Sequence, residues 1–132
     1  MRERDDPLNL TGIWHGNYSY PYFQESVSFV ATIIESGGHV SGSTHEPHGF
    51  RPETLYASLS GRRDGRAVTF IKVCQNGGLE YASPIEYQGS LSEDGTEIEG
   101  RWTIPSDWSG KFLMIRSGGR KASVSQERFE KV

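Results

Sequence analysis

The sequence predicts an all-β protein folded as an eight-stranded antiparallel up-and-down β-barrel. Segments of roughly 6 to 11 residues, in which side chains alternate between polar and apolar, recur from end to end. Each segment closes in a turn-forming cluster, and the chain is rich in turn and strand formers, with 16 Gly, six Tyr, six Phe and three Trp. No segment before residue 120 shows a 3.6-residue apolar period, which excludes crossover helices and a parallel sheet.

The first half of the chain contains four of the predicted strands. The segment 10–20 ends at Pro21, and 25–35 alternates with Val27, Phe29, Ala31 and Ile33 on one face before Ser36-Gly37-Gly38 turns the chain. The predicted strand 39–46 leads into a long loop, 47–53, whose prolines and Gly49 exclude regular structure. The predicted strand 54–62 ends at the turn Arg63-Asp64-Gly65.

The second half supplies the other four strands in the same manner. The predicted strand 66–74 is rich in β-branched and aromatic residues and precedes the hairpin turn 75–78. Pro84 within the predicted strand 79–91 indicates a bend or an open edge. The turn 93–95 then separates it from the last two strands, 96–104 and 108–116.

Short links between eight antiparallel strands favour closure, because a closed barrel exposes no edge and encloses room for one small ligand. A two-sheet sandwich is the alternative. We expect one domain over 1–132, with a tail at 1–9, the barrel at 10–118 and a second tail at 119–132, of which 123–132 is either a short helix or a ninth extended segment.

Composition narrows the classes of function. The net charge of -3 and the absence of a basic cluster argue against nucleic-acid binding. Cys74 is the one cysteine, so no internal disulfide can form. The charged start, 1–6, is followed by no apolar run, so we expect neither a signal peptide nor a membrane-spanning helix, and a cytoplasmic protein.

Several short motifs resemble landmarks of the avidin/streptavidin family, which belongs to the calycin, or lipocalin-like, barrels. Gly12-Ile13-Trp14 is similar to the start of the family's first strand, where the tryptophan plugs one end of the barrel. Later landmarks follow in the family's order: Gly38-His39-Val40-Ser41-Gly42-Ser43, Leu59-Ser60-Gly61-Arg62, Tyr87-Gln88-Gly89, Ile98-Glu99-Gly100-Arg101-Trp102 and Trp108.

This resemblance covers about nine-tenths of the chain and implies the fold. Most of the residues with which the family binds biotin are, however, replaced by others in this chain. Gly16 and Tyr20 stand where the family has an asparagine and a serine. The family has a tyrosine, a serine, a threonine and an aspartate at the positions that match Thr44, Glu46, Ile85 and Arg116, respectively. Ser83 and Trp102 match, and Tyr87 keeps aromatic character. Because unpaired buried donors cost about 1 to 3 kcal/mol each, biotin binding is not expected.

Strand alternation from Trp14 predicts which side chains enter the interior. Trp14 is expected as a structural plug. Further core positions are Phe29, Ile33, Val40, Leu59, Val68, Phe70, Ile98 and Met114. The predicted ligand-binding residues near the open half are Tyr18, Tyr20, Thr44, Glu46, Lys72, Ser83, Tyr87, Trp102 and Arg116.

Two interpretations of the charged interior residues stay open. In the first, Lys72 or Arg116 offers a cation to a small polar or anionic molecule between aromatic walls. In the second, Glu46, Lys72 and Arg116 form an internal salt bridge with no ligand, or Lys72 reaches solvent. The sequence does not identify the ligand.

The first interpretation predicts a non-catalytic binding protein that needs no cofactor. The alternatives are an enzyme with Glu46 as base and Tyr20 or Lys72 as acid, or a structural module. No nucleophile elbow is present, and His45-x-x-His48 lacks a third ligand, so neither a catalytic triad nor a metal site is predicted. Outward-facing Thr103, Leu113 and Ile115 suggest association into a homodimer or homotetramer.

Overall fold

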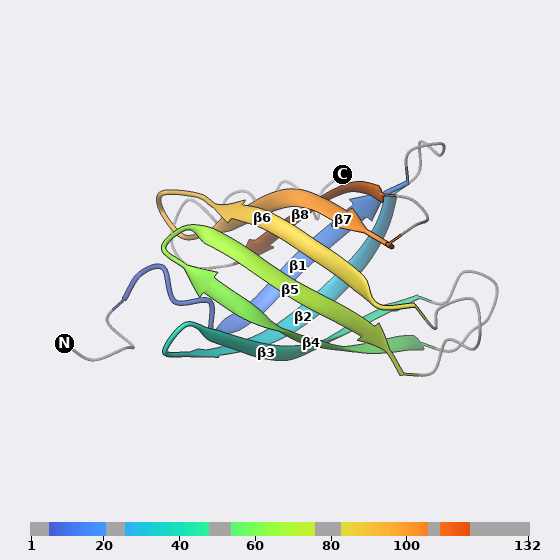
Figure 1. The fold of residues 1–132 in the computed structure, drawn as a ribbon, viewed down its shortest axis with the longest axis horizontal. Coiled ribbons are helices and arrows are strands. Elements are labelled where there is room, and N and C mark those ends of the chain that lie inside the picture. The colour runs from blue at the N-terminus through green and yellow to red at the C-terminus, as the bar shows by residue number, and fades with distance from the viewer. Residues whose placement is uncertain (1–5, 21–25, 48–53, 76–82, 106–108, 117–132) are drawn as a thin grey trace, which may run out of the picture.

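The fold is a closed antiparallel β-barrel (Figure 1). The structure, a computed structural model, describes residues 6–20, 26–47, 54–75, 83–105 and 109–116. Its strands are β1 Gly12–Ser19, β2 Ser26–Ser36, β3 His39–Pro47, β4 Thr54–Asp64, β5 Ala67–Cys74, β6 Ile85–Leu91, β7 Glu97–Thr103 and β8 Ser109–Arg116. Each strand pairs with the next, and β1 pairs with β8 to complete the ring. The predicted up-and-down barrel is therefore confirmed.

As the sequence predicts, every second side chain along the strands points inward and helps to fill the barrel. In β1, Trp14, Gly16 and Tyr18 are buried, whereas Ile13 and His15 are exposed. All eight predicted core positions beyond Trp14 are buried hydrophobic residues. Burial of such side chains stabilises the fold by about 1.5 to 3 kcal/mol for each large aliphatic or aromatic residue.

Two-residue turns join strands at one end of the barrel. Ser36 pairs with His39 across Gly37 and Gly38, whose φ angles of 58° and 87° lie in the left-handed region that hairpin turns require. At the next hairpin the strand extends two residues beyond the predicted end at residue 62. Asp64 still pairs with Ala67, so β4 extends through Asp64 and the turn begins at Gly65.

β6 is shorter than the predicted strand 79–91. It begins at Ile85, directly after Pro84, which has no N–H to contribute to a ladder. Positions 76–82 lie outside the described residues, as do Trp108, most of the loop 47–53 and the tail 119–132. The described residues include no helix long and apolar enough to cross a membrane.

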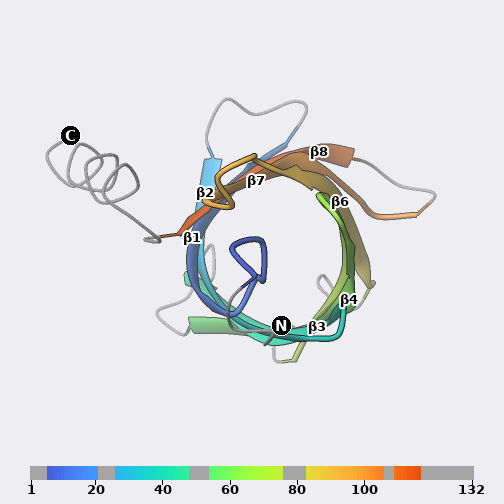
Figure 2. The same ribbon diagram turned by 90° about the vertical axis from the view of Figure 1, so that its left-hand side faces the viewer.

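The N-terminal segment 6–11, expected in part as a tail, folds across the end of the barrel that carries the short turns. Viewed down the barrel, it lies inside the ring of strands (Figure 2). Leu10 is fully buried, and its carbonyl accepts a hydrogen bond of 2.9 Å from Trp14 Nε1. Trp14 is also covered by the Arg116 guanidinium, 4.7 Å from its ring centre. Trp14 therefore closes this end together with the N-terminal segment.

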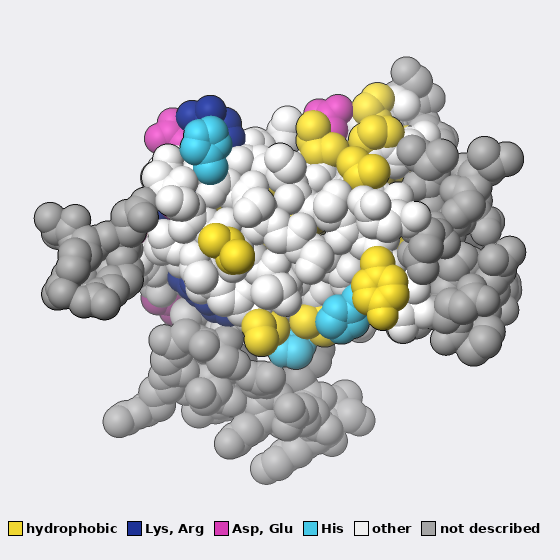
Figure 3. Space-filling model, turned by 90° about the horizontal axis from the view of Figure 1, so that it is seen from below, with side chains coloured by type: hydrophobic (Ala, Val, Ile, Leu, Met, Phe, Trp, Pro, Cys, Tyr) yellow, Lys and Arg dark blue, Asp and Glu magenta, His cyan; other side chains and the backbone are white. Residues whose placement is uncertain are grey.

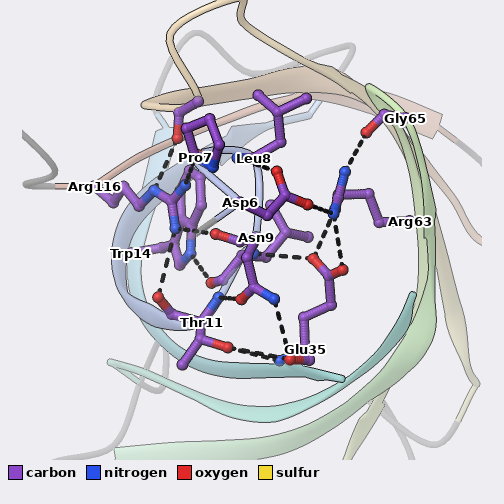
Figure 4. A network of polar contacts seen from close by, with 12 residues as sticks. Asp6, Pro7, Leu8, Asn9, Thr11, Trp14, Glu35, Arg63, Gly65 and Arg116 are labelled. Carbon is purple, nitrogen blue, oxygen red and sulfur yellow. Dashed lines mark hydrogen bonds and ion pairs between the residues drawn. The ribbon is translucent and has the colours of Figure 1, made fainter. Parts of the chain in front are cut away.

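Charged side chains fasten the segment to the barrel wall (Figure 4). Arg63 Nε lies 2.7 Å from Glu35 Oε1, and Arg63 Nη2 lies 2.7 Å from Asp6 Oδ2. Glu35 also accepts the Leu10 N–H at 3.0 Å. The Glu35 side chain is only 2% exposed, so its charge depends on these partners.

We predict that Arg63→Met destabilises the protein by about 3 kcal/mol, because it leaves the buried Glu35 carboxylate without its cation. Urea unfolding would measure the change. Arg62→Met is the matched control, since Arg62 is exposed on the same strand, and it should change the free energy of unfolding by less than about 0.5 kcal/mol. Equal effects of the two substitutions would contradict this role of the Arg63–Glu35 pair.

Candidate functional site

A cluster of polar side chains occupies the barrel interior toward its other end. Glu46 on β3 and Lys72 on β5 are both buried, at 4% and 2% exposed, and Tyr18 on β1 and Tyr87 on β6 complete the group. Every member sits at an inward position of its strand. The cluster is thus a direct product of strand alternation in a closed barrel.

The Glu46 carboxylate is the centre of the cluster. Lys72 Nζ donates to Glu46 Oε1 at 2.7 Å, and the Tyr18 hydroxyl donates to Glu46 Oε2 at 2.5 Å. Tyr87 lies beside the same ammonium group, with Lys72 Nζ 5.9 Å from the centre of its ring. Each carboxylate oxygen is therefore bonded, and the pair carries no net charge.

The register explains how Glu46 and Lys72 meet although a strand separates them. Glu46 pairs with Leu55 and Lys72 pairs with Leu59, so Ala57 lies between those two positions on β4. The small side chain of Ala57 leaves the space above β4 to the two long charged side chains. A larger residue at this position would push them apart.

Aromatic rings surround the ammonium group. Lys72 Nζ lies 4.9 Å from the centre of the Tyr18 ring, 5.4 Å from that of Phe29 and 5.9 Å from that of Tyr87. These separations permit cation–π attraction, which is strongest where water is excluded. Phe29 in turn fills the space above Gly16, where an added Cβ would lie 2.4 Å from the ring. The glycine is needed for this packing.

Thr44 lies two residues before Glu46 on the same inward face of β3. It is 2% exposed, and its Oγ1 has no hydrogen-bond partner among the described residues. Its inward neighbours on the adjoining strands are Ala31 and Ala57, whose side chains offer none. A buried hydroxyl without a partner costs about 1 to 3 kcal/mol, and a bound polar group would offset that cost.

Tyr20 and Trp102 form an aromatic wall next to Tyr18. The Tyr20 and Trp102 ring centres are 5.4 Å apart and nearly perpendicular, and each lies about 6 Å from that of Tyr18. Trp102 Nε1 donates to the Ser19 carbonyl at 3.0 Å, which fixes the indole. Tyr20 is half-buried and packs against the core.

The structure thus brings together seven of the nine predicted ligand-binding residues. Ser83 is exposed just before β6. Arg116 lies at the Trp14 end, where its guanidinium donates to the Asn9 and Gly95 carbonyls. Since β1 pairs Trp14 with Arg116 and Tyr18 with Phe112, the four-residue offset separates Arg116 from the cluster by roughly 13 Å along the strands. Of the salt bridge among Glu46, Lys72 and Arg116, one of the two interpretations left open, the structure shows only the Glu46–Lys72 pair.

The second buried charge pair, Glu35–Arg63, was not predicted. The signal was present, because the inward alternation of β2 through Phe29, Ala31 and Ile33 continues to Glu35. On β4 the inward series through Leu59 and Gly61 continues in the same way to Arg63. Both residues stand beside turns, and Arg63 was predicted as part of a turn and not of a strand.

The other candidate groups stay apart. His15, His39 and His45 are exposed on the outer surface, and His48 lies outside the described residues. Within the described ranges no three His, Cys, Asp or Glu side chains gather as metal ligands. Burial raises the pKa of the Cys74 thiol, which keeps it in its less reactive protonated form.

Burial and neighbouring charge set the protonation states of the cluster. Burial opposes the charged form of Lys72, but Tyr87 and the Glu46 carboxylate favour it, and the net effect raises the pKa of its ammonium group. Burial, then Glu46, raises the pKa of Tyr18. Burial also raises the pKa of Tyr87 to about 12. At neutral pH the cluster therefore contains an ammonium ion and two protonated phenols.

Comparisons with known proteins give no assignment for this barrel. No family model matches the chain, and neither a curated protein nor a solved structure matches it significantly.

These protonation states predict a loss of stability in alkali. The Tyr87 pKa is near 10 in the unfolded chain and about 12 in the folded one, so the stabilisation is complete below pH 10 and is lost as the pH rises toward 12. Two pKa units correspond to a loss of about 3 kcal/mol. Lys72 and Tyr18 act in the same direction.

Urea unfolding at pH 8, 10 and 11.5 would measure this loss, and Tyr87→Phe should reduce it. The variant is expected to start about 1 kcal/mol less stable at pH 8, because the buried Lys72 ammonium group loses a favourable polar neighbour. An identical pH dependence in the wild type and in Tyr87→Phe would contradict the contribution of Tyr87.

Proposed function

We propose that this protein binds a small polar molecule inside the barrel, without chemical turnover, at the Lys72–Glu46 cluster. The observation that carries the proposal is a buried ion pair beside a buried hydroxyl, Thr44 Oγ1, that has no partner among the described residues. A barrel interior needs no charge for stability, since well-packed apolar residues stabilise as well or better than a buried ion pair. A polar cluster at this position is therefore better explained by recognition than by folding.

The arrangement of the two ends supports the same proposal. The Trp14 end has two-residue turns and is filled by the segment 6–11. The third connection at that end, 92–96 between β6 and β7, has five residues, whereas the four connections at the opposite end, 20–25, 48–53, 75–84 and 104–108, have five to ten. In up-and-down barrels, longer connections surround the mouth through which a ligand enters. The cluster and the Tyr20–Trp102 wall both lie toward this end.

The charge of the cluster favours a neutral polar ligand over an anion. Glu46 already balances Lys72, so an added carboxylate would meet a neutral pair and be repelled by Glu46. A group with both a donor and an acceptor, such as an amide, can instead bond Thr44 and a member of the pair. The rings of Tyr18, Tyr20 and Trp102 suit a flat apolar or aromatic body attached to that group.

The same geometry argues against Glu46 and Lys72 as an acid–base pair. A lysine with a raised pKa is a weak proton donor and a poor nucleophile near neutral pH. Glu46 is held by two hydrogen bonds, which a general base would have to break. Binding without turnover is the simpler use of these groups.

Relationship to the avidin branch of calycin barrels is part of the proposal and rests on the order of sequence landmarks. Biotin is not the expected ligand. Phe29 fills the space above Gly16, a position at which the family has an asparagine, and Glu46 and Lys72 pair with each other. The ligand proposed here is recognised by a different set of groups.

Benzamide and benzoate provide a matched test, because they share a ring and differ in the charge of the head group. Benzamide should raise the melting temperature and bind with a dissociation constant of about 1 mM, as expected for so small a ligand. Benzoate should bind at least about tenfold more weakly. Isothermal titration, together with native mass spectrometry for a co-purified compound, would measure both.

Glu46→Gln should reverse the preference, since it leaves the Lys72 cation unbalanced and keeps the size of the side chain. Ser83→Ala is the control, because Ser83 is exposed and lies outside the cluster, and it should bind both probes as the wild type does. The proposal fails if no molecule co-purifies and neither probe binds at about 10 mM, roughly ten times the expected dissociation constant.

A further inference from the structure

The outer surface of the barrel is divided by charge. The outward side chains at 28–34 of β2, 41–45 of β3, 56–60 of β4 and 69–73 of β5 include no Asp, Glu, Lys or Arg, although the chain is 23% charged. We call these positions the neutral face. By contrast, β6, β7 and β8 each have an exposed charged residue, among them Glu86 on β6, Glu99 on β7 and Lys111 on β8.

The side chains on the neutral face also differ in size, because small serines lie between larger aliphatic residues. The register places Ile34, Ser41, Ser60 and Ile71 in one row across the four strands. The next row has serines at the two middle positions again and Val73 on β5. Two strands of small serine side chains, a serine strip, are thus flanked by Ile34 on one side and by Ile71 and Val73 on the other.

The flanking hydrophobic residues are freely exposed. Ile34 is 60% exposed, Ile71 46% and Val73 38%. Figure 3 shows the β3 and β4 side of the barrel, with apolar and His side chains scattered over a largely uncharged surface and the charged ones near its margins. Depletion of charge is the compositional mark of the centre of a protein–protein interface.

We propose that the neutral face is a dimer interface that binds the same face of a second copy of this chain. A twofold axis along the serine strip would place the two serine strips against each other and the Ile34 flank of each copy over the Ile71 and Val73 flank of the other, so that small side chains meet in the middle and apolar ones on both sides. A partner recognised through charge would find nothing to pair with on this face. A second copy presents an equally neutral surface, and the pairing keeps the charged β6–β8 sides of both copies far apart.

The size of the face fits a modest interface. Outward positions spaced about 6.8 Å along strands that are about 4.8 Å apart cover on the order of 400 Å² in projection. The outward residues of β1, including Ile13 at 58% exposed, extend it at one edge. Interfaces at the lower end of the size range bury about 600 Å² per partner. We therefore expect a reversible dimer with a micromolar dissociation constant.

This face differs from the one the sequence suggested. Leu113 and Ile115 are only half-exposed, and in register they lie beside Glu99 and Glu97. Two copies meeting through that surface would bring these carboxylates together. The proposed association therefore uses β2–β5 and not that surface.

Sedimentation velocity of the full chain between about 1 and 100 µM tests the proposal, because that range brackets the expected dissociation constant. The wild type should shift from monomer to dimer as concentration rises. Ser58→Arg, in the middle of the serine strip, should raise the dimer dissociation constant at least about 30-fold, since the twofold axis brings the two new charges close together. Ile71→Lys, on the flank, should also weaken the dimer.

Thr103→Arg is the control, because it adds the same charge to an exposed position of β7. It should leave the dimer dissociation constant unchanged. Thermal unfolding confirms that each variant is folded before it is compared. A wild type that stays monomeric at about 100 µM, a dimer that survives both neutral-face substitutions, or one that Thr103→Arg disrupts instead would each overturn the proposal.

Discussion

Closure of the sheet is the constraint on which the rest of this structure depends. Once β1 pairs with β8, every second side chain of every strand points into a space without bulk water. An ionisable residue at an inward position must then find its counter-charge inside. Glu46 finds Lys72, and Glu35 finds Arg63. Both pairs connect next-but-one strands, so each pair links the two neighbours of an intervening strand.

The two pairs serve different ends of the barrel. Glu35 and Arg63 also bind the N-terminal segment, through Leu10 and Asp6, and so belong to the closure around Trp14. The Glu46 pair binds no such segment among the described residues and lies among aromatic rings beside a hydroxyl that has no partner there. Glu35 and Arg63 are bonded by the N-terminal segment of the chain itself. Beside Glu46 and Lys72, in contrast, the Thr44 hydroxyl has no hydrogen-bond partner among the described residues. This difference is the physical basis for placing recognition at Glu46 and Lys72.

Alternation and turn chemistry in the sequence were sufficient for the fold and for much of the site. Counting every second residue from Trp14 places Tyr18 inside the barrel. The same alternation along β3 and β5 places Glu46 and Lys72 inside. Which inward residues meet depends on register and strand tilt, and local sequence encodes neither. Arg116 was therefore assigned to the wrong end. The outer surface could have been analysed for charge in the same way, but its division emerges only when strands are ordered around the ring.

Nuclear magnetic resonance of the Lys72 side chain tests the central claim most directly, because a buried, hydrogen-bonded ammonium exchanges slowly enough to be observed. The claim is that the ion pair itself contacts the ligand. Addition of benzamide should shift the Lys72 Nζ resonance in proportion to the bound fraction measured independently. Saturation with bound benzamide and an unchanged Lys72 resonance would contradict the claim and leave the Glu46–Lys72 pair a structural element of the barrel.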